Sequence, residues 1–492
     1  MARFFIIAAI LAWATSVLGL SEPGYYANLT WEKPRTLSNW ANLTVETPSG
    51  TFIGFLNDTY PNVRQFLRVP YAQYVSSTST MWSEYEPTNL LINLGEIWTP
   101  AYANKTSKLP VALFCYWRRW CDWWNRCPIS DAATVDFAVS RTHCYHNQLP
   151  GQYLWQYVIW AQVSCLKILM KLPDPKSRAL NETSLSLLDV RAATEWVYEN
   201  IELFGGDPEN IMLWGQSQGA ALTHLYTIVF PDEPLASHFS VISRPTSVTL
   251  DVTDAEDVYE DFDIVAKALG CNYGDDAEAE LNCMRGISWV QIEEFINRYS
   301  GLPSISFSDY IPDERYTFSN ESKRYLEGKI AKGPGIRSDT ERESASTNLT
   351  STAEAEVEWD CVAALDTTRR YALGLDTYRY YWGGKFTNIS PVSWLGAFHW
   401  SDLLMIFGTY SKQVGPISQL EIDTSITMQD FILAFLKDPA SVSGLGWDLF
   451  DPHDANGGQI LEFGKGNPVH NITGDYLDAP CWNSSLKGRI NG

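Results

Sequence analysis

The sequence has few positively charged residues for its length. It contains 36 lysines and arginines against 58 aspartates and glutamates, which gives a formal net charge of −22 over 492 residues. A surface with this excess of negative charge repels the phosphates of nucleic acids and of anionic lipids. We therefore expect no nucleic-acid partner.

Signals of several other protein classes are also missing. We find no internal repeat and no heptad pattern. No cysteine and histidine spacing is typical of a zinc site, and no phosphate-binding loop or dinucleotide fingerprint occurs. After the N-terminus, no run approaches the about 18 apolar residues of a membrane-spanning helix. We expect no metal, no cofactor and no stable membrane span.

The N-terminus and the sequons indicate export. Residues 1–19 combine one basic residue, Arg3, with an apolar run that begins at Phe4 and ends near small residues, which is typical of a secretory signal peptide. The remaining residues, 20–492, are then expected to form one domain. An Asn-x-Ser/Thr pattern, typical of secreted glycoproteins, occurs at Asn28, Asn42, Asn57, Asn104, Asn181, Asn320, Asn348, Asn388, Asn471 and Asn483.

The hydrophobic pattern favours an α/β protein. Residues 43–72 alternate as strands around turns and predict an N-terminal antiparallel β-meander. Residues 187–201 place apolar side chains at helical spacing, 211–214 read as a short buried strand, and 220–229 are apolar and helix-forming. This alternation predicts a mostly parallel central sheet flanked by helices.

The junction after the buried strand reads Gly-Gln-Ser-Gln-Gly at residues 215–219, a G-x-S-x-G pattern. A nucleophilic serine needs a sharp, strained turn that lifts its hydroxyl off the sheet, and glycines on either side leave room for that turn. A glycine- and serine-containing loop can match by chance, but the required strand and helix flank this one. The pattern predicts Ser217 as a nucleophile.

Three segments carry a resemblance to a known family. Residues 187–220 resemble the nucleophile region of type-B carboxylesterases, which include cholinesterases and some secreted fungal lipases. Residues 54–73 are similar to the family's N-terminal strand block, with Arg68 where glycine is usual. Residues 394–410 are similar to its histidine block, with Trp400 where glycine is common. The resemblance implies an α/β-hydrolase fold and ester hydrolysis by serine, acid and histidine, in that chain order.

Transferred to this chain, the resemblance implies His399 as the general base and an acid before it. The alternative for His399 is a buried structural histidine. The acid candidates are Asp339, Glu341 and Glu343. Counting along the fungal-type pattern selects Glu343, with Ser344 in place of the usual glycine; Glu341 and a solvated acidic loop stay as alternatives.

The oxyanion hole is the family feature that the chain lacks. The backbone N–H of Gln218 is expected to contribute one donor, but the rest come from a glycine-rich loop after a strand like that at 108–114. Residues 115–127 read CYWRRWCDWWNRC, without glycine. Tryptophan's codon, read one nucleotide later, begins with GG and encodes glycine. Four tryptophans therefore permit a glycine-rich loop in that frame: Trp117, Trp120, Trp123 and Trp124.

A later segment agrees with the same shift. In the same shifted frame, the codons of residues 143–156 can encode the family's next strand and its Asn-Tyr-Arg motif. We therefore hypothesise that residues 115–175 are mistranslated through a frameshift and a retained intron, and we expect the printed chain to have low or no activity. The alternative is a genuine Trp/Cys-rich loop that replaces the oxyanion loop.

The cysteines outside that segment number four. Cys271 and Cys283 bracket a short loop, as the family's small disulfide does, and Cys361 with Cys481 is the remaining pair.

The sequence is thus expected to encode a secreted carboxylic-ester hydrolase, with a small-molecule or lipid ester as substrate. The alternatives are a catalytically silent cholinesterase-like binding or adhesion protein and the inactive product of a faulty gene model.

Overall fold

The computed structural model describes the greater part of the chain. The described residues all belong to the compact unit Asn42–Gly492. The predicted signal peptide and the predicted oxyanion loop lie outside them. The described residues are 43–57, 60–71, 94–116, 159–164, 177–179, 184–244, 259–301, 305, 313–345 and 353–482.

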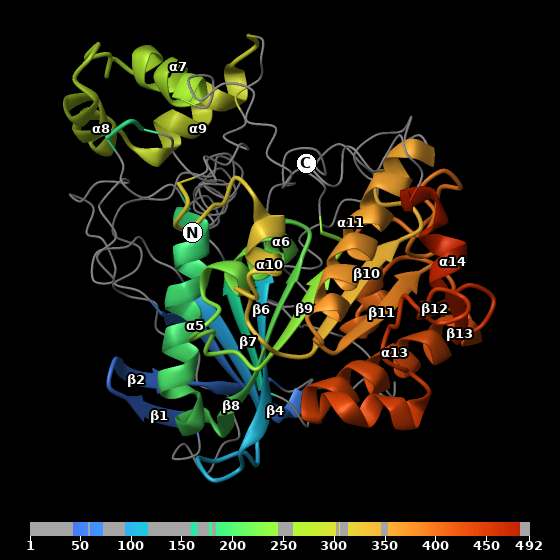
Figure 1. Ribbon diagram of the computed structural model, residues 1–492. Coiled ribbons are helices and arrows are strands. Elements are labelled where there is room, and N and C mark those ends of the chain that lie inside the picture. The colour runs from blue at the N-terminus through green and yellow to red at the C-terminus, as the bar shows by residue number, and fades with distance from the viewer. Residues whose placement is uncertain are drawn as a thin grey trace, which may run out of the picture. The chain divides into compact units, whose positions relative to one another are not determined.

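The described residues form an 11-stranded sheet with the order β13-β12-β11-β10-β9-β8-β6-β7-β5-β4-β3. Figure 1 shows the strands of this sheet with helices beside them. A separate antiparallel pair, β1 (Thr44–Thr47) and β2 (Gly50–Ile53), precedes the sheet. The strands of the large sheet are β3 (Phe55–Asn57), β4 (Tyr60–Pro70), β5 (Leu94–Pro100), β6 (Leu109–Tyr116), β7 (Ile159–Ser164), β8 (Gly206–Gln216), β9 (His238–Ile242), β10 (Gly335–Thr340), β11 (Thr377–Trp382), β12 (Gln459–Phe463) and β13 (Val469–Thr473).

The middle of the sheet is parallel and its edges are antiparallel. Seven strands lie in the order β7, β6, β8, β9, β10, β11 and β12, and each pairs in parallel with the next. The pairs β3–β4, β4–β5, β5–β7 and β12–β13 are antiparallel. This confirms the predicted mostly parallel α/β sheet with N-terminal antiparallel strands. It is the strand arrangement expected of an α/β-hydrolase.

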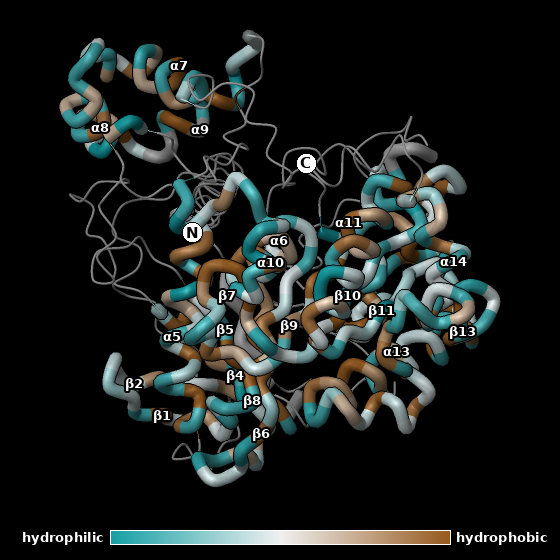
Figure 2. The backbone as a smooth tube through the Cα atoms, viewed as in Figure 1, coloured by the Kyte–Doolittle hydropathy of each residue, from teal (hydrophilic) through white to brown (hydrophobic). Residues whose placement is uncertain are grey.

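Alternate residues of the central strands enter two separate cores. Val111 of β6 and Leu213 of β8 pack with α5 (Leu185–Phe204), whereas Phe114 and Trp214 pack in the core that also contains α13 (Gln419–Lys437). Because successive strand side chains point to opposite faces, a strand covered on both sides must be apolar throughout. Figure 2 shows the hydrophobic residues on α13 in brown.

The predicted segments fall where the patterns placed them. The helix expected at 187–201 lies within α5, the strand at 211–214 within β8, and the helix at 220–229 within α6 (Gln218–Val229). The meander at 43–72 corresponds to β1 to β4. The turn after α5 is closed by Gly205, whose φ of +102° suits glycine.

Strand β7 comes from the segment that we assigned to a frameshift or a retained intron. Residues Val111–Tyr116 of β6 pair in parallel with Ile159–Ser164, and β5 pairs with the other edge of β7. The printed chain thus supplies a strand between β6 and β5. In the shifted frame, the family's strand would instead be encoded by residues 143–156. Strand β7 of the printed chain begins after them, at Ile159.

The remaining helices form two groups. Around the sheet lie α10 (Glu321–Leu326), α11 (Ala353–Ala372), α12 (Ser401–Ile406) and α14 (Gly474–Leu477). Helices α7 (Glu260–Ala268), α8 (Ala277–Arg285) and α9 (Trp289–Arg298) share a small apolar core of their own. Within the described part of the chain, no helix is long and apolar enough to cross a membrane.

Candidate active site

Ser217 stands at the turn between β8 and α6. Its φ of +57° and ψ of −123° lie in a region that residues with a side chain rarely adopt. The turn is held by a hydrogen bond of 3.0 Å from the Ser217 backbone N–H to the Ile242 carbonyl at the end of β9. The strained turn that the sequence predicted is present at this serine.

The two glycines of the motif are required by close backbone contacts. A Cβ on Gly215 would lie 2.1 Å from the carbonyl oxygen of Gly219, and a Cβ on Gly219 would lie 2.2 Å from the carbonyl oxygen of Cys115. Contacts this short with backbone atoms have no simple relief. Glycine therefore lets the first turn of α6 pack directly on the ends of β8 and β6.

His399 and Glu343 are in contact. Nδ1 of His399 meets Oε2 of Glu343, and Oε1 of Glu343 accepts a hydrogen bond of 2.7 Å from the Thr340 N–H. Glu343 is 1% exposed, so the alternative of a solvated acidic loop is wrong for this residue. A backbone hydrogen bond of 3.0 Å from Arg342 to Ala397 joins the two loops.

The other two acid candidates point elsewhere. Oε2 of Glu341 lies 2.5 Å from the Lys385 ammonium, and its Oε1 lies 3.4 Å from that of Lys465. Asp339 is buried in β10, where burial and then the Glu343 charge hold the pKa of its carboxyl well above the ordinary value. Of the three candidates, Glu343 is the one that the structure brings to His399.

The second ring nitrogen of His399 has a partner that sequence reasoning missed. The side-chain amide nitrogen of Gln216 lies 3.1 Å from Nε2 of His399, and both side chains are buried. The Trp359 ring lies against the imidazole, with ring centroids 5.1 Å apart. Gln216 stands directly before Ser217, but it occupies a variable position of the G-x-S-x-G pattern, so the pattern indicates no role for it.

Two residues that stand where the family usually has glycine lie at irregular backbone. Trp400 directly follows His399 and has a φ of +68°, the left-handed conformation that glycine adopts most easily. Its ring packs edge-on against Phe398, with centroids 4.9 Å apart. Arg68 lies in β4, where the pairing register with β5 shifts between Phe66 and Val69.

A buried acidic residue lies close to His399. Asp402 is fully buried in α12, and burial raises the pKa of its carboxyl to about 6. Its Oδ2 accepts a hydrogen bond of 2.8 Å from the Tyr380 hydroxyl, and its Oδ1 accepts one of 3.0 Å from the Leu403 N–H. Burial, followed by Asp339, also holds the pKa of Asp360 well above the ordinary value.

Similarity to known proteins agrees with this geometry. Residues 183–356, which include Ser217 and Glu343, match the Carboxylesterase family. A chlorogenic acid esterase of Aspergillus niger is 31% identical over 454 residues, which cover 82% of this chain and 84% of that protein. The chain belongs to the carboxylesterase family.

Two further relatives extend the comparison for this carboxylesterase-family protein. Secreted lipase 5 of Gibberella zeae is 28% identical over 471 residues, 83% of this chain and 88% of the lipase. Carboxylesterase 5A of the dog, Canis lupus familiaris, is 23% identical over 290 residues, 58% of this chain and 42% of that enzyme. The relatives are thus esterases and secreted lipases by name.

The residues predicted to surround the oxyanion fall on both sides of the described boundary. Gln218 is the first residue of α6, where the helix N-terminus favours negative charge. Residues 117–158, where the glycine-rich loop is expected, lie outside the described residues. Cys115, two residues before them, is buried at the end of β6, and burial raises the pKa of its thiol to about 12.

Both expected disulfides are present. Cys271 and Cys283 are bonded with Cα atoms 5.5 Å apart and join α8 to the residues before it. Cys361 of α11 and Cys481 near the C-terminus are bonded with Cα atoms 5.2 Å apart, across 120 positions of sequence. Such crosslinks are typical of proteins folded in an oxidising compartment.

One of the predicted glycosylation sites is buried in the folded protein. Asn388 is 3% exposed, and its Nδ2 donates hydrogen bonds to the Tyr410 carbonyl at 3.3 Å and to Oε1 of buried Glu421 at 2.7 Å. A glycan on that nitrogen would displace both bonds. The sequons at Asn104, Asn320 and Asn471 are exposed, and Asn57 lies in β3. The other five lie outside the described residues: Asn28, Asn42, Asn181, Asn348 and Asn483.

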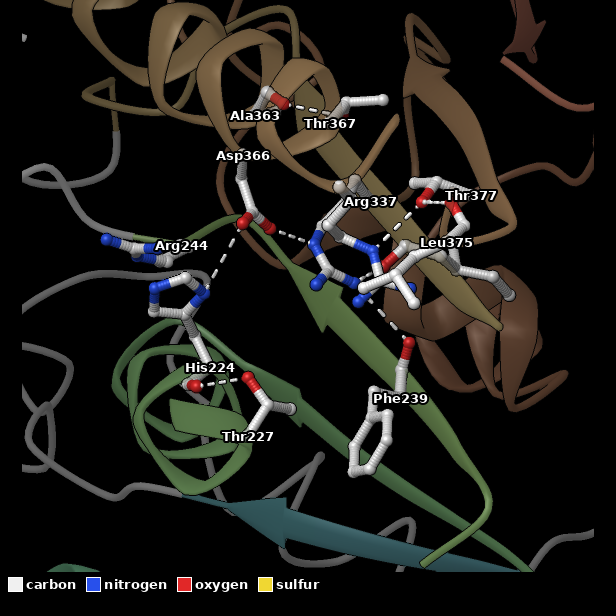
Figure 3. Close-up of polar contacts among 12 residues, drawn as sticks. His224, Thr227, Phe239, Arg244, Arg337, Ala363, Asp366, Thr367, Leu375 and Thr377 are labelled. Carbon is white, nitrogen blue, oxygen red and sulfur yellow. Dashed lines mark hydrogen bonds and ion pairs between the residues drawn. The ribbon is translucent and has the colours of Figure 1, made fainter. Parts of the chain in front are cut away.

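A second buried polar network extends from α6. His224 lies seven positions after Ser217, with Nε2 at 3.2 Å from Oε2 of Glu321 and Nδ1 at 3.6 Å from Oδ1 of Asp366. Figure 3 shows Asp366 reaching from α11 between His224 and Arg337, whose Nε contacts Oδ2 of Asp366. Burial, and then Arg244, lower the pKa of His224.

The charge of Asp366 is favoured by its neighbours. Burial alone would raise the pKa of this carboxyl, but the nearby guanidinium groups, Arg337 first and then Arg244 and Arg370, hold it well below the ordinary value. The network therefore contains a carboxylate and a neutral histidine near neutral pH. Over the described residues, no group of three or more histidine, cysteine, aspartate or glutamate side chains could hold a metal ion.

Proposed function

We propose that this protein is a secreted carboxylic-ester hydrolase in which Ser217, His399 and Glu343 form a catalytic triad. The observation that carries the proposal is the contact between Glu343 and Nδ1 of His399, in a site where the neighbouring Gln216 leads directly into the strained turn at Ser217. Membership of the carboxylesterase family supports the same reaction class.

The reaction begins with a proton transfer. Nε2 of His399 takes the proton of the Ser217 hydroxyl as the serine oxygen forms a bond to the ester carbonyl carbon. The resulting oxyanion receives a hydrogen bond from the Gln218 N–H. The imidazolium then gives its proton to the leaving alcohol as the carbon–oxygen bond breaks, and an acyl-serine remains.

Water completes the cycle. His399 takes a proton from a water molecule, whose oxygen attacks the acyl carbon and releases the carboxylic acid as the proton returns to Ser217. Glu343 holds the proton on Nδ1 throughout, which keeps the Nε2 lone pair available and stabilises the cation formed in each half.

The substrate class is a carboxylic ester of a small molecule or a lipid. The names of the relatives, an esterase of chlorogenic acid and a secreted lipase, support that class. Export is supported by the signal-like residues 1–19, the exposed sequons and the two disulfides.

The reading frame of residues 115–175 is part of the proposal. We propose that the printed residues there replace a glycine-rich oxyanion loop through a frameshift and a retained intron. Loss of oxyanion donors typically costs about 10²–10³-fold in kcat, so the printed chain should be a slow enzyme. Sequencing the transcript tests this, and an uninterrupted in-frame message encoding CYWRRWCDWW would contradict it.

Hydrolysis of a chromogenic short-chain ester tests the enzyme proposal. The printed chain and the same chain with Ser217→Ala are compared under equal conditions. A rate above the uncatalysed background that disappears in Ser217→Ala is expected. Equal background rates would instead favour a catalytically silent binding protein or an inactive product, the alternatives suggested by the missing glycines.

A further inference from the structure

Gln216 is held beside His399 by the end of strand β8. Its backbone pairs with Ile242 in the parallel β8–β9 ladder, and its side chain is 6% exposed. Its amide nitrogen lies 3.1 Å from Nε2 of His399, which is hydrogen-bond distance. Because both side chains are buried, water does not readily replace this contact.

The contact with Glu343 determines the direction of the hydrogen bond. A carboxylate is an acceptor, so it keeps a proton on Nδ1 of His399, and the neutral ring then carries its lone pair on Nε2. The NH₂ group of the Gln216 amide is a donor and faces that lone pair. The resulting N–H···N hydrogen bond exists in the neutral ring and is lost when Nε2 is protonated.

We propose that Gln216 is a positioning residue that caps the Nε2 lone pair of His399 in the resting protein. It keeps the ring in the orientation and tautomer of a general base, and it opposes protonation of the ring. The role of His399 as a general base rests on the proposed function, but the hydrogen bond from Gln216 and its effect on ring protonation do not. The Ser217 hydroxyl needs the same lone pair, so the amide must leave Nε2 before the serine proton transfers.

Several carboxyl groups lie around the His399 ring. Glu343 contacts the Nδ1 side, and Asp402 of α12 interacts electrostatically with the ring. Asp339 of β10 and Asp360 of α11 interact electrostatically with Glu343. These are all carboxyl groups, and when ionised they favour the imidazolium, whereas the Gln216 donor favours the neutral ring.

A titration that does not depend on hydrolysis tests the proposal. The full-length Ser217→Ala protein, labelled with ¹³C-histidine, is titrated by NMR with and without Gln216→Met, and His399→Gln identifies the resonance. Methionine has a similar length but no donor. We expect the titration midpoint of His399 to rise by about 0.5–1 pH unit in Gln216→Met. An unchanged midpoint would overturn the proposal.

Two further variants complete the experiment. Gln216→Glu retains the shape of the side chain and places an acceptor at Nε2 of His399, so the titration midpoint should rise by about 1–2 pH units. An unchanged midpoint in this variant would also overturn the proposal. This test remains decisive if Gln216→Met fails to fold. Gln429→Met removes another buried glutamine amide, on α13, and should leave the midpoint unchanged. Failure of the proposed hydrolysis would appear separately, in the ester assay.

Discussion

Glu343 and His399 are 56 positions apart in the sequence, yet Oε2 of one contacts Nδ1 of the other. Each follows one of two neighbouring parallel strands: Glu343 comes three residues after β10, and His399 lies in the loop after β11. The carboxyl ends of parallel strands meet at the same edge of a sheet, and Ser217 follows β8 at that edge. The site is therefore built by strands that lie side by side.

Replacing Glu343 and Glu341 in turn distinguishes the two acid candidates. Glu343→Gln should lower kcat for a chromogenic ester by at least about 10²-fold, towards the rate of Ser217→Ala, because an amide does not hold the His399 tautomer as a carboxylate does. Glu341→Gln should leave kcat within about 2-fold, since Glu341 pairs with two lysines at the surface of the site. The opposite ranking would assign the acid to Glu341.

The close contact between α6 and β6 predicts a loss of stability. Gly219→Ala places a Cβ 2.2 Å from the Cys115 carbonyl oxygen, so the free energy of unfolding in urea should fall by about 3 kcal/mol. Gly444→Ala is the matched control, because a Cβ there meets no atom within 4 Å and the φ is not positive. Equal midpoints for the two variants would mean that α6 does not pack on β6 as described.

Asp402 should make the protein less stable at neutral pH. Burial raises its pKa to about 6, above the ordinary value of 3.8, so its stabilising contribution is complete below about pH 4 and is lost as the pH rises through 6. Asp402→Asn should therefore raise the free energy of unfolding by roughly 2 kcal/mol at pH 7.5 and by much less at pH 4. The control Asp448→Asn, at an exposed position, should leave the free energy of unfolding unchanged at both pH values. An effect of Asp402→Asn that does not depend on pH would contradict the raised pKa of Asp402.

His224 should make stability fall in acid. The pKa of His224 in the folded protein is below the ordinary value of 6.5, so the unfolded chain takes up this proton more readily than the folded protein does. The contribution of His224 to the free energy of unfolding is therefore complete above pH 6.5 and is lost as the pH decreases. Between pH 6.5 and 5, urea unfolding of His224→Asn should lose less stability than that of the wild type. The control His453→Asn, at an exposed position, should lose as much stability as the wild type over this pH range. An equal loss in His224→Asn would argue against a neutral buried histidine.

The sequence predicted those elements whose pattern is local. Residues 211–214 are apolar without interruption because β8 is buried on both faces, and the G-x-S-x-G pattern follows from the backbone contacts at Gly215 and Gly219. Counting along the family pattern also selected Glu343. In these cases the physical requirement falls on a few consecutive residues, so it can be read from them.

Contacts made across the fold were not predictable in this way. The bond between Gln216 and His399 joins residues 183 positions apart, and nothing in either neighbourhood indicates the other. Asn388 has the sequence of an ordinary sequon, because its burial depends on a contact with Glu421 of α13, 33 positions later. Strand β7 was missed because residues 159–164 become a strand through pairing with β5 and β6 on either side.

The burial of Asn388 has a consequence for biosynthesis. In an exported chain, oligosaccharide is added to sequons while the polypeptide is still entering the secretory compartment, before the Asn388 amide has met Tyr410 and Glu421. A molecule modified there cannot complete this part of the core. Under the proposed export, each new chain would face a competition between folding and glycosylation at Asn388, and the yield of native protein would depend on which is faster.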